Sequence, residues 1–151
     1  MTDNPLPRLV PSLAEPSLLV NPAAVTVFDR GGGVVTVPYV GKWNSSAATF
    51  TTGVTRFAVG TGLPLHLHNV EESVLILAGE AVAEVGDDRV ELTAGQATWV
   101  PANVPHRFLN RGDSEMSIYW VYGGRDVTRT IIATGKTVEH LSAEDRGGAR
   151  A

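Results

Sequence analysis

Two stretches decide the fold: residues 60–79 read GTGLPLHLHNVEESVLILAG, and residues 95–110 read GQATWVPANVPHRFLN. Both contain short runs of apolar and β-branched residues that end at Gly, Pro or Asn. Runs of this length, interrupted about every eight to twelve residues by turn signals, are typical of a β-sandwich or β-barrel. We therefore expect an all-β domain.

The same pattern extends outward from these stretches in both directions. The predicted strands cover residues 25–28, 34–42, 49–59, 65–68, 73–77, 81–85, 89–92, 97–100, 106–110 and 116–122. Gly, Asn and Asp lie between them, and these residues favour turns. The strands fit one barrel domain over residues 23–142, a length that suits a single hydrophobic core.

The two ends of the chain differ from this middle part in composition. Residues 1–22 contain five prolines, which are unfavourable in helices and central strands, so we predict an extended arm. Its Leu and Val residues, together with the open sheet edges of a small barrel, predict a homodimer in which the arm covers the neighbour. Residues 143–151, AEDRGGARA, are small and charged, so we predict a flexible tail.

Composition and charge exclude several classes of function. Twelve Lys and Arg residues against sixteen Asp and Glu residues give a net charge of -4, which argues against nucleic-acid binding. The chain has no cysteine, which excludes disulfides, thiolate metal sites and cysteine nucleophiles. It has no apolar run of the roughly 20 residues that cross a membrane and no secretory signal pattern, so we expect a cytoplasmic protein without a membrane partner.

Histidines and one carboxylate form the candidate chemical centre. His66 and His68 alternate within one predicted strand, so both imidazoles lie on the same face. Glu72 begins the next strand, and a hairpin return would bring its carboxylate beside them. His106 begins a later strand after the stiff segment 101–105. Three imidazoles and one carboxylate make a good site for a divalent metal ion.

Two other residues, Glu71 and His140, are alternative candidates for metal ligands. Glu71 replaces Glu72 as the ligand if the connection after the histidine pair is one residue shorter. His140 lies near the polar end of the chain, where an exposed position is the expectation rather than metal ligation.

In these residues the chain resembles the cupin superfamily. That family's first motif, G-x5-H-x-H-x3,4-E-x6-G, is filled at every fixed position between Gly60 and Gly79. Its second motif, G-x5-P-x-G-x2-H-x3-N, is filled between Gly95 and Asn110, except that Asn103 stands where the family has Gly. Asparagine tolerates a left-handed backbone better than other non-glycine residues, so we expect the turn to be kept.

The resemblance implies a double-stranded β-helix, or jelly-roll barrel, with one divalent metal ion per chain. By this resemblance the metal ligands are His66, His68, Glu72 and His106. The resemblance implies iron or manganese first, and nickel, copper, zinc and cobalt stay possible because no thiolate ligand selects among them.

The substrate pocket is less well specified by the sequence. Arg56 would offer a cation to an anionic substrate if its face of the strand points inward, and an outward arginine is an equal alternative. Phe108 shares a face with His106, while Trp120 and Tyr122 alternate along the last predicted strand. We predict these four residues as pocket residues, and the phenols of the chain are the candidates for proton transfer.

Open positions on a redox-active metal favour a dioxygenase-type oxidoreductase that acts on a small organic molecule. A metal-dependent isomerase, lyase or decarboxylase is the first alternative. A non-catalytic cupin that binds or senses a small molecule is the second, because a fold alone does not determine chemistry.

Overall fold

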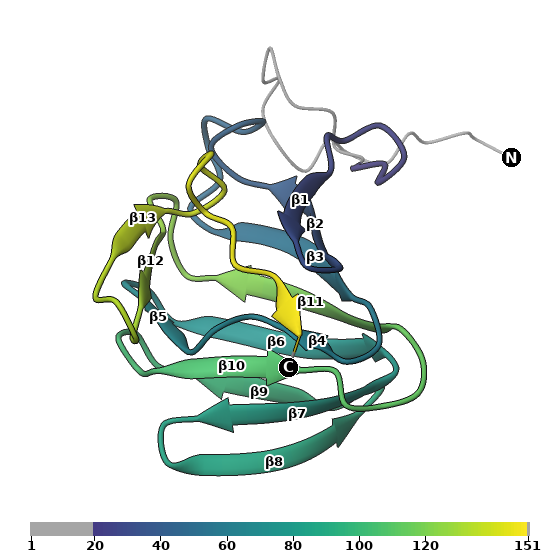
Figure 1. Ribbon diagram of the computed structural model, residues 1–151. Helices are drawn as coiled ribbons and strands as arrows, with labels where there is room; N and C mark the ends of the chain where they lie inside the picture. Colours follow the sequence, from purple (N-terminus) through teal and green to yellow (C-terminus); the bar gives the residue numbers. More distant parts are fainter. Residues whose placement is uncertain (1–19, 151) are drawn as a thin grey trace, which may run out of the picture.

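The computed structural model describes residues 20–150, which form two antiparallel sheets with no helix among them (Figure 1). The first sheet contains six strands in the order β1 (Phe28–Gly31), β2 (Val34–Val40), β3 (Thr51–Phe57), β11 (Met116–Tyr122), β6 (Glu72–Ala78) and β9 (Ala97–Val100). Because these residues form no helix, the described chain holds no helix long and apolar enough to cross a membrane.

The second sheet contains eight strands. Along its main path lie β13 (Thr137–Glu139), β12 (Thr128–Ile131), β5 (His66–His68), β10 (His106–Leu109), β4 (Thr61–Gly62) and β14 (Ala149–Arg150). The remaining two are β7 (Glu80–Val85), which pairs with β10, and β8 (Asp88–Thr93), which pairs with β7.

The inner faces of the two sheets pack against each other. Phe57 and Ile76 from the first sheet share one buried cluster with Ala83 and Phe108 from the second. Burial alternates strictly along β11, as expected for a strand with one face in the core. The predicted all-β jelly-roll barrel is therefore confirmed.

Most predicted strands agree with the structure, and β9 and β11 have the predicted bounds. The first strand lies at Phe28–Gly31 instead of 25–28, because it pairs with β2 through an irregular register next to the glycine turn. Four short strands, β4, β12, β13 and β14, are not among those predicted from the sequence. These strands are only two to four residues long and their sequences contain few apolar residues, so their apolar signal is weak.

The predicted flexible tail is wrong for residues 143–148. Asp145 is completely buried and forms ion pairs with Arg30 and Arg129. The backbone amides of Gly147 and Gly148 also donate hydrogen bonds to the carbonyl of Arg30, both over 3.2 Å. These contacts hold the segment against the barrel, and a composition-based reading could not reveal them. Of the predicted arm, residues 1–19 lie outside the described residues, and the homodimer stays a prediction.

Candidate metal centre

Three buried histidines meet on the inner face of the second sheet. His66 on β5 is paired directly with His106 on β10, and His68 lies two residues along β5 on the same face. The ring centroids of His106 lie 4.5 Å from His66 and 5.2 Å from His68. One ring nitrogen from each histidine belongs to a group whose atoms all lie within 4.8 Å of one another. Such a group could hold a metal ion.

Backbone carbonyls orient all three rings in the same way. The Nδ1 atoms of His66, His68 and His106 lie 2.6, 3.0 and 2.9 Å from the carbonyl oxygens of Pro64, Thr128 and Val104. A carbonyl only accepts hydrogen bonds, so each Nδ1 carries the proton and donates. Each Nε2 is then left with a free lone pair, the arrangement that fixes a histidine as a metal ligand.

Glu72 approaches the histidines from the opposite sheet. Its Oε2 lies 2.8 Å from His106 Nε2 and 3.7 Å from His68 Nε2. The predicted hairpin between these residues is wrong, because β5 and β6 belong to different sheets and the connection crosses the barrel. Glu71 is exposed and accepts a hydrogen bond from Trp99 Nε1 over 3.3 Å. The structure therefore places Glu72, and not Glu71, beside the imidazoles.

These four side chains fit a divalent metal ion. Glu72 Oε2 and His106 Nε2 are buried, and despite their close approach they are not aligned as a hydrogen bond, so neither has a hydrogen-bond partner among the described residues. Two buried polar atoms left without partners are costly, and a cation between them would satisfy both. Three nitrogen donors and one anionic oxygen donor suit a divalent transition metal.

Burial keeps two of the imidazoles neutral. It lowers the pKa of His66 well below its ordinary value, and it lowers the pKa of His68 to about 4 despite the nearby Glu72 carboxylate. Burial acts in the same direction on His106, but the Glu72 carboxylate outweighs it and raises the pKa of that ring. A metal ion would take the place of the proton that Glu72 favours on His106.

The turn before His106 joins the two parts of the centre. Asn103 has a φ of 63°, in the left-handed region, as expected for the residue that replaces glycine in the second motif. Its amide donates a 2.8 Å hydrogen bond to the carbonyl of His68. This bond connects the His68 strand to the loop that delivers His106.

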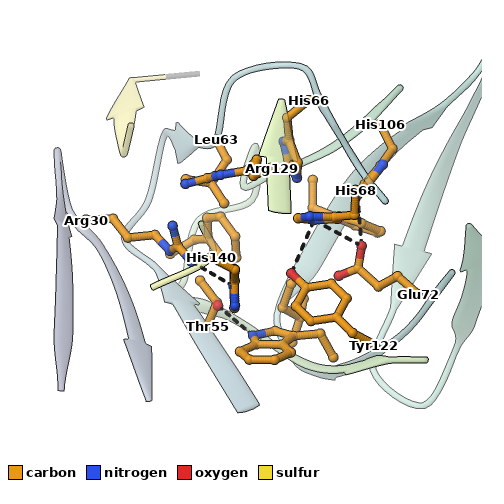
Figure 2. Close-up of a pocket in the computed structure, with 14 residues that line it drawn as sticks. Arg30, Thr55, Leu63, His66, His68, Glu72, His106, Tyr122, Arg129 and His140 are labelled. Atoms are coloured by element: carbon orange, nitrogen blue, oxygen red, sulfur yellow. Dashed lines mark hydrogen bonds and ion pairs between the residues drawn. The ribbon is translucent and has the colours of Figure 1, made fainter. Parts of the chain in front are cut away.

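The histidines and Glu72 line a small cavity between the sheets (Figure 2). The region that the centre of a water molecule can occupy inside it has a volume of about 20 Å³. This is space for one or two waters. The other lining residues are Arg30, Thr55, Phe57, Leu63, Phe108, Ile118, Trp120, Tyr122, Arg129 and His140. The hydroxyl of Tyr122 lies 3.2 Å from His68 Nε2 and donates to it, because that nitrogen carries the free lone pair.

Two arginines occupy the cavity wall away from Glu72. Arg30 Nη1 lies 3.1 Å from the carboxylate of Asp145, and Arg129 Nη2 pairs with the other oxygen of the same carboxylate. Arg30 Nη2 also lies 3.2 Å from His140 Nε2, which must accept because a guanidinium only donates. All four side chains are buried.

Three of the four predicted pocket residues line this cavity: Phe108, Trp120 and Tyr122. The prediction for Arg56 is wrong, since this residue is exposed and the opposite face of β3, which carries Thr55 and Phe57, points inward.

The expectation of an exposed His140 is also wrong. This residue is buried against Trp120 and Tyr122, with ring centroids 5.1 and 4.9 Å away. Two cavity residues, Arg30 and Arg129, are not among the residues predicted from the sequence. The sequence offers a signal only for Arg129. This residue lies between two threonines in a β-prone run, so its side chain would be assigned to the opposite face of a strand from theirs.

His140 also borders a second, larger space. A groove of about 720 Å³ is lined mainly by the segments 25–28, 42–44 and 139–142, and the two half-exposed apolar residues Val27 and Trp43 are among its lining residues. His140 lines both this groove and the small inner cavity. It is therefore a shared wall between the two spaces.

Comparison with known proteins agrees with this architecture. Residues 53–122 match the family model of the cupin domain, a range that contains all three histidines and Glu72. No curated protein matches the sequence. Among solved structures, an RmlC-like cupin from Shewanella frigidimarina NCIMB 400 has 17% identity and a TM-score of 0.61, covering 73% of this chain and 93% of that one.

Two further solved structures are enzymes of larger size. A mutant of oxalate decarboxylase from Bacillus subtilis has 18% identity and a TM-score of 0.62, covering 68% of this chain but only 29% of that one. An oxalate oxidase has 16% identity and a TM-score of 0.61, covering 67% and 56% of the two chains. At such identities the likeness shows the fold alone. Together with the family match, the fold shows that this chain contains a cupin domain.

Proposed function

We propose that this protein is a metal-dependent enzyme acting on a small organic molecule, and that its reaction is an oxidation of the dioxygenase type. One observation carries the proposal: three Nε2 lone pairs, each fixed by a backbone hydrogen bond at Nδ1, converge with Glu72 in a buried cavity. We propose His66, His68, Glu72 and His106 as the ligands of one divalent ion per chain. Iron or manganese is the first expectation.

The ligand set leaves room for chemistry. A bound redox-active ion would supply Lewis acidity and electron transfer at positions that the four protein ligands do not fill. Phe57, Phe108 and Ile118 surround the same cavity and are buried, so they limit the water that it can hold. Exclusion of water strengthens every electrostatic interaction inside the site.

Tyr122 is the residue best placed to hold a proton beside a bound substrate. Burial raises the pKa of its phenol well above the ordinary value, and the Glu72 carboxylate acts in the same direction, so the hydroxyl stays protonated. Its present acceptor is His68 Nε2. When a metal ion takes that lone pair, the hydroxyl loses this acceptor and becomes free to donate to a substrate oxygen.

The same phenol supports a second candidate function. In a decarboxylase, lyase or isomerase the metal polarises a carbonyl group and a nearby acid moves a proton, and Tyr122 lies where such an acid is needed. The likeness to oxalate decarboxylase is compatible with this candidate but concerns the fold only. Oxygen dependence separates the two reactions.

Turnover with and without oxygen tests the proposal. The protein loaded with Fe(II) or Mn(II) would be incubated with small carboxylic and oxo acids, and oxygen uptake and product formation would be followed in air and under argon. A dioxygenase consumes oxygen in step with product and is inactive under argon. Equal turnover under argon favours the second candidate.

The control for this experiment is the protein with His66→Ala and His68→Ala, which should show no turnover. A ligand that binds the loaded protein tightly and is recovered unaltered in both atmospheres would contradict an enzymatic role and would indicate a binding or sensing cupin.

A further inference from the structure

We propose that the substrate carries a carboxylate group and that Arg129, supported by Arg30, binds it. This inference rests on the proposed function, because it places the substrate in the cavity beside the metal ligands. It assigns a specificity role to an arginine that lies outside both histidine motifs.

The position of Arg129 follows from strand pairing. β12 pairs with β5 so that Arg129 lies opposite His68, and Ile131 lies opposite His66. Directly opposite residues in a sheet share a face, so the Arg129 side chain enters the barrel on the side of the metal ligands. Figure 2 shows Arg129 and Arg30 on one side of the cavity and Glu72 on the other.

The Nε donor of Arg129 has no acceptor in the part of the chain that the structure describes. Its Nη2 is used by the Asp145 carboxylate and by the carbonyl of Arg146. Its Nε is buried and has no hydrogen-bond partner among the described residues, although the side chain is only 1% exposed. A buried charged donor without a partner is costly, and an oxygen atom of a bound carboxylate would satisfy it.

The charge of the cavity also favours an anionic ligand. Arg30 and Arg129 are balanced by the carboxylates of Asp145 and Glu72. A divalent ion at the histidines would therefore add two uncompensated positive charges inside the barrel. Buried charge is unfavourable without a partner of opposite sign, so a carboxylate in the cavity would be stabilised by both the metal and Arg129.

The size of the cavity restricts the ligand further. With space for only one or two waters between the side chains, the cavity restricts the ligand to the smallest carboxylates, of the size of formate or acetate. Arginine is also suited to the carboxylate itself, because its planar donors match the two oxygens in geometry.

A purely structural role is the competing explanation. Arg129 and Arg30 both bind Asp145, and through it they hold the C-terminal segment against the barrel. If the two arginines only held this segment in place, mutating them would alter stability. The cavity would then not distinguish a carboxylate from an uncharged molecule of the same shape. Selective ligand binding therefore separates the two roles.

Acetate and acetamide are matched probes, because they share a shape and differ in charge. Calorimetric titration would measure the binding of each to the zinc-loaded protein and to the metal-free protein. We expect both forms to bind acetate and to prefer it over acetamide. Zinc is chosen because it is redox-silent, so that binding is measured without turnover.

Three variants assign the preference to Arg129. Arg129→Lys keeps the charge beside Asp145 but removes the Nε donor, and acetate should bind about tenfold more weakly. Arg129→Gln combined with Asp145→Asn removes both charges together, and we expect a loss of about 100-fold. The control, Arg56→Gln, changes an exposed arginine outside the cavity and should leave the acetate affinity unchanged.

Equal binding of acetate and acetamide by the unaltered protein would overturn the inference. Unchanged acetate affinity in folded Arg129→Lys protein would also overturn it. Failure of zinc to bind would contradict the proposed function instead, and the acetate preference of the metal-free protein would still decide the role of Arg129.

Discussion

The two sides of the cavity are built in different ways. The metal side consists of His66, His68, Glu72 and His106, which come from two short motifs close together in the sequence. The arginine side consists of Arg30, Arg129, His140 and Asp145, which come from opposite ends of the domain. Spacing identifies the first group, whereas only tertiary structure brings the second group together.

The two sides also differ in electrostatics. The metal side combines two imidazoles that burial keeps neutral, a third whose pKa is raised by the neighbouring carboxylate, and that carboxylate itself. On the arginine side, two buried guanidinium groups share one carboxylate. We therefore expect mutations on the metal side to act on metal binding, and mutations on the arginine side to act on stability and ligand selectivity.

The largest effect should follow from removing two metal ligands. In the double variant His66→Ala and His68→Ala, metal content should fall from about one ion per chain to almost none, because only one imidazole and Glu72 are left. The barrel has its own apolar core and should still fold, but without the stabilisation that a bound ion provides. Elemental analysis and circular dichroism measure both effects, and unchanged metal content would refute the assignment.

A large effect on stability is expected from Asp145→Ala. This change leaves two buried arginines without their shared carboxylate and should lower the free energy of unfolding by about 3–5 kcal/mol. Glu144→Ala is a matched control, because that neighbour forms only an exposed ion pair with Lys136 and should change stability by less than about 0.5 kcal/mol. Chemical denaturation gives both values. Similar losses in the two variants would contradict a distinct arginine side.

Metal affinity should depend on one of two adjacent carboxylates. Glu72→Gln removes the anionic ligand and should weaken metal binding at least about tenfold, while the shape of the side chain is kept. Glu71→Gln should change it little, because that residue is exposed and faces Trp99. Competition with a metal-binding dye measures both affinities. The reverse result would shift the register of β6 by one residue.

A smaller effect concerns the pH dependence of stability. Burial alone would raise the pKa of Asp145, but Arg30 and Arg129 outweigh it and hold this pKa below its ordinary value. A carboxyl whose pKa is lowered by folding stabilises the protein above its unfolded pKa, and this contribution is lost as pH falls through the folded pKa. The free energy of unfolding should therefore decrease as pH falls below about 4.

The variant Asp145→Asn serves as the comparison for this measurement. It should be less stable at neutral pH and should lose less stability on acidification, because the group that titrates is gone. An identical acid dependence in both proteins would show that other carboxylates determine it.

The metal side could be predicted almost completely from the sequence. Alternation placed His66 and His68 on one face, and the structure confirms that Asn103 takes the left-handed conformation in place of glycine. Alternation alone could not determine which face of β3 points inward, so Arg56 was assigned to the wrong side. That choice depends on which face meets the opposite sheet.

The arginine side could not be predicted for a different reason. Asp145 lies in a segment whose small and polar residues resemble a disordered tail, and it is ordered by two arginines more than a dozen residues away in sequence. His140 lies in a polar stretch but is buried by aromatic residues of another strand. Such contacts join residues far apart in the sequence, so local composition does not predict them.

The shared wall formed by His140 has a consequence for the rate at which molecules exchange. A small molecule that approaches from the outer groove meets this imidazole before it reaches the inner cavity. By that route, arrival and departure require the ring to leave its contacts with Arg30, Trp120 and Tyr122, while the sheets stay in place. For exchange by that route, residence time would depend on the movement of this one side chain, and it could change without any change in equilibrium affinity.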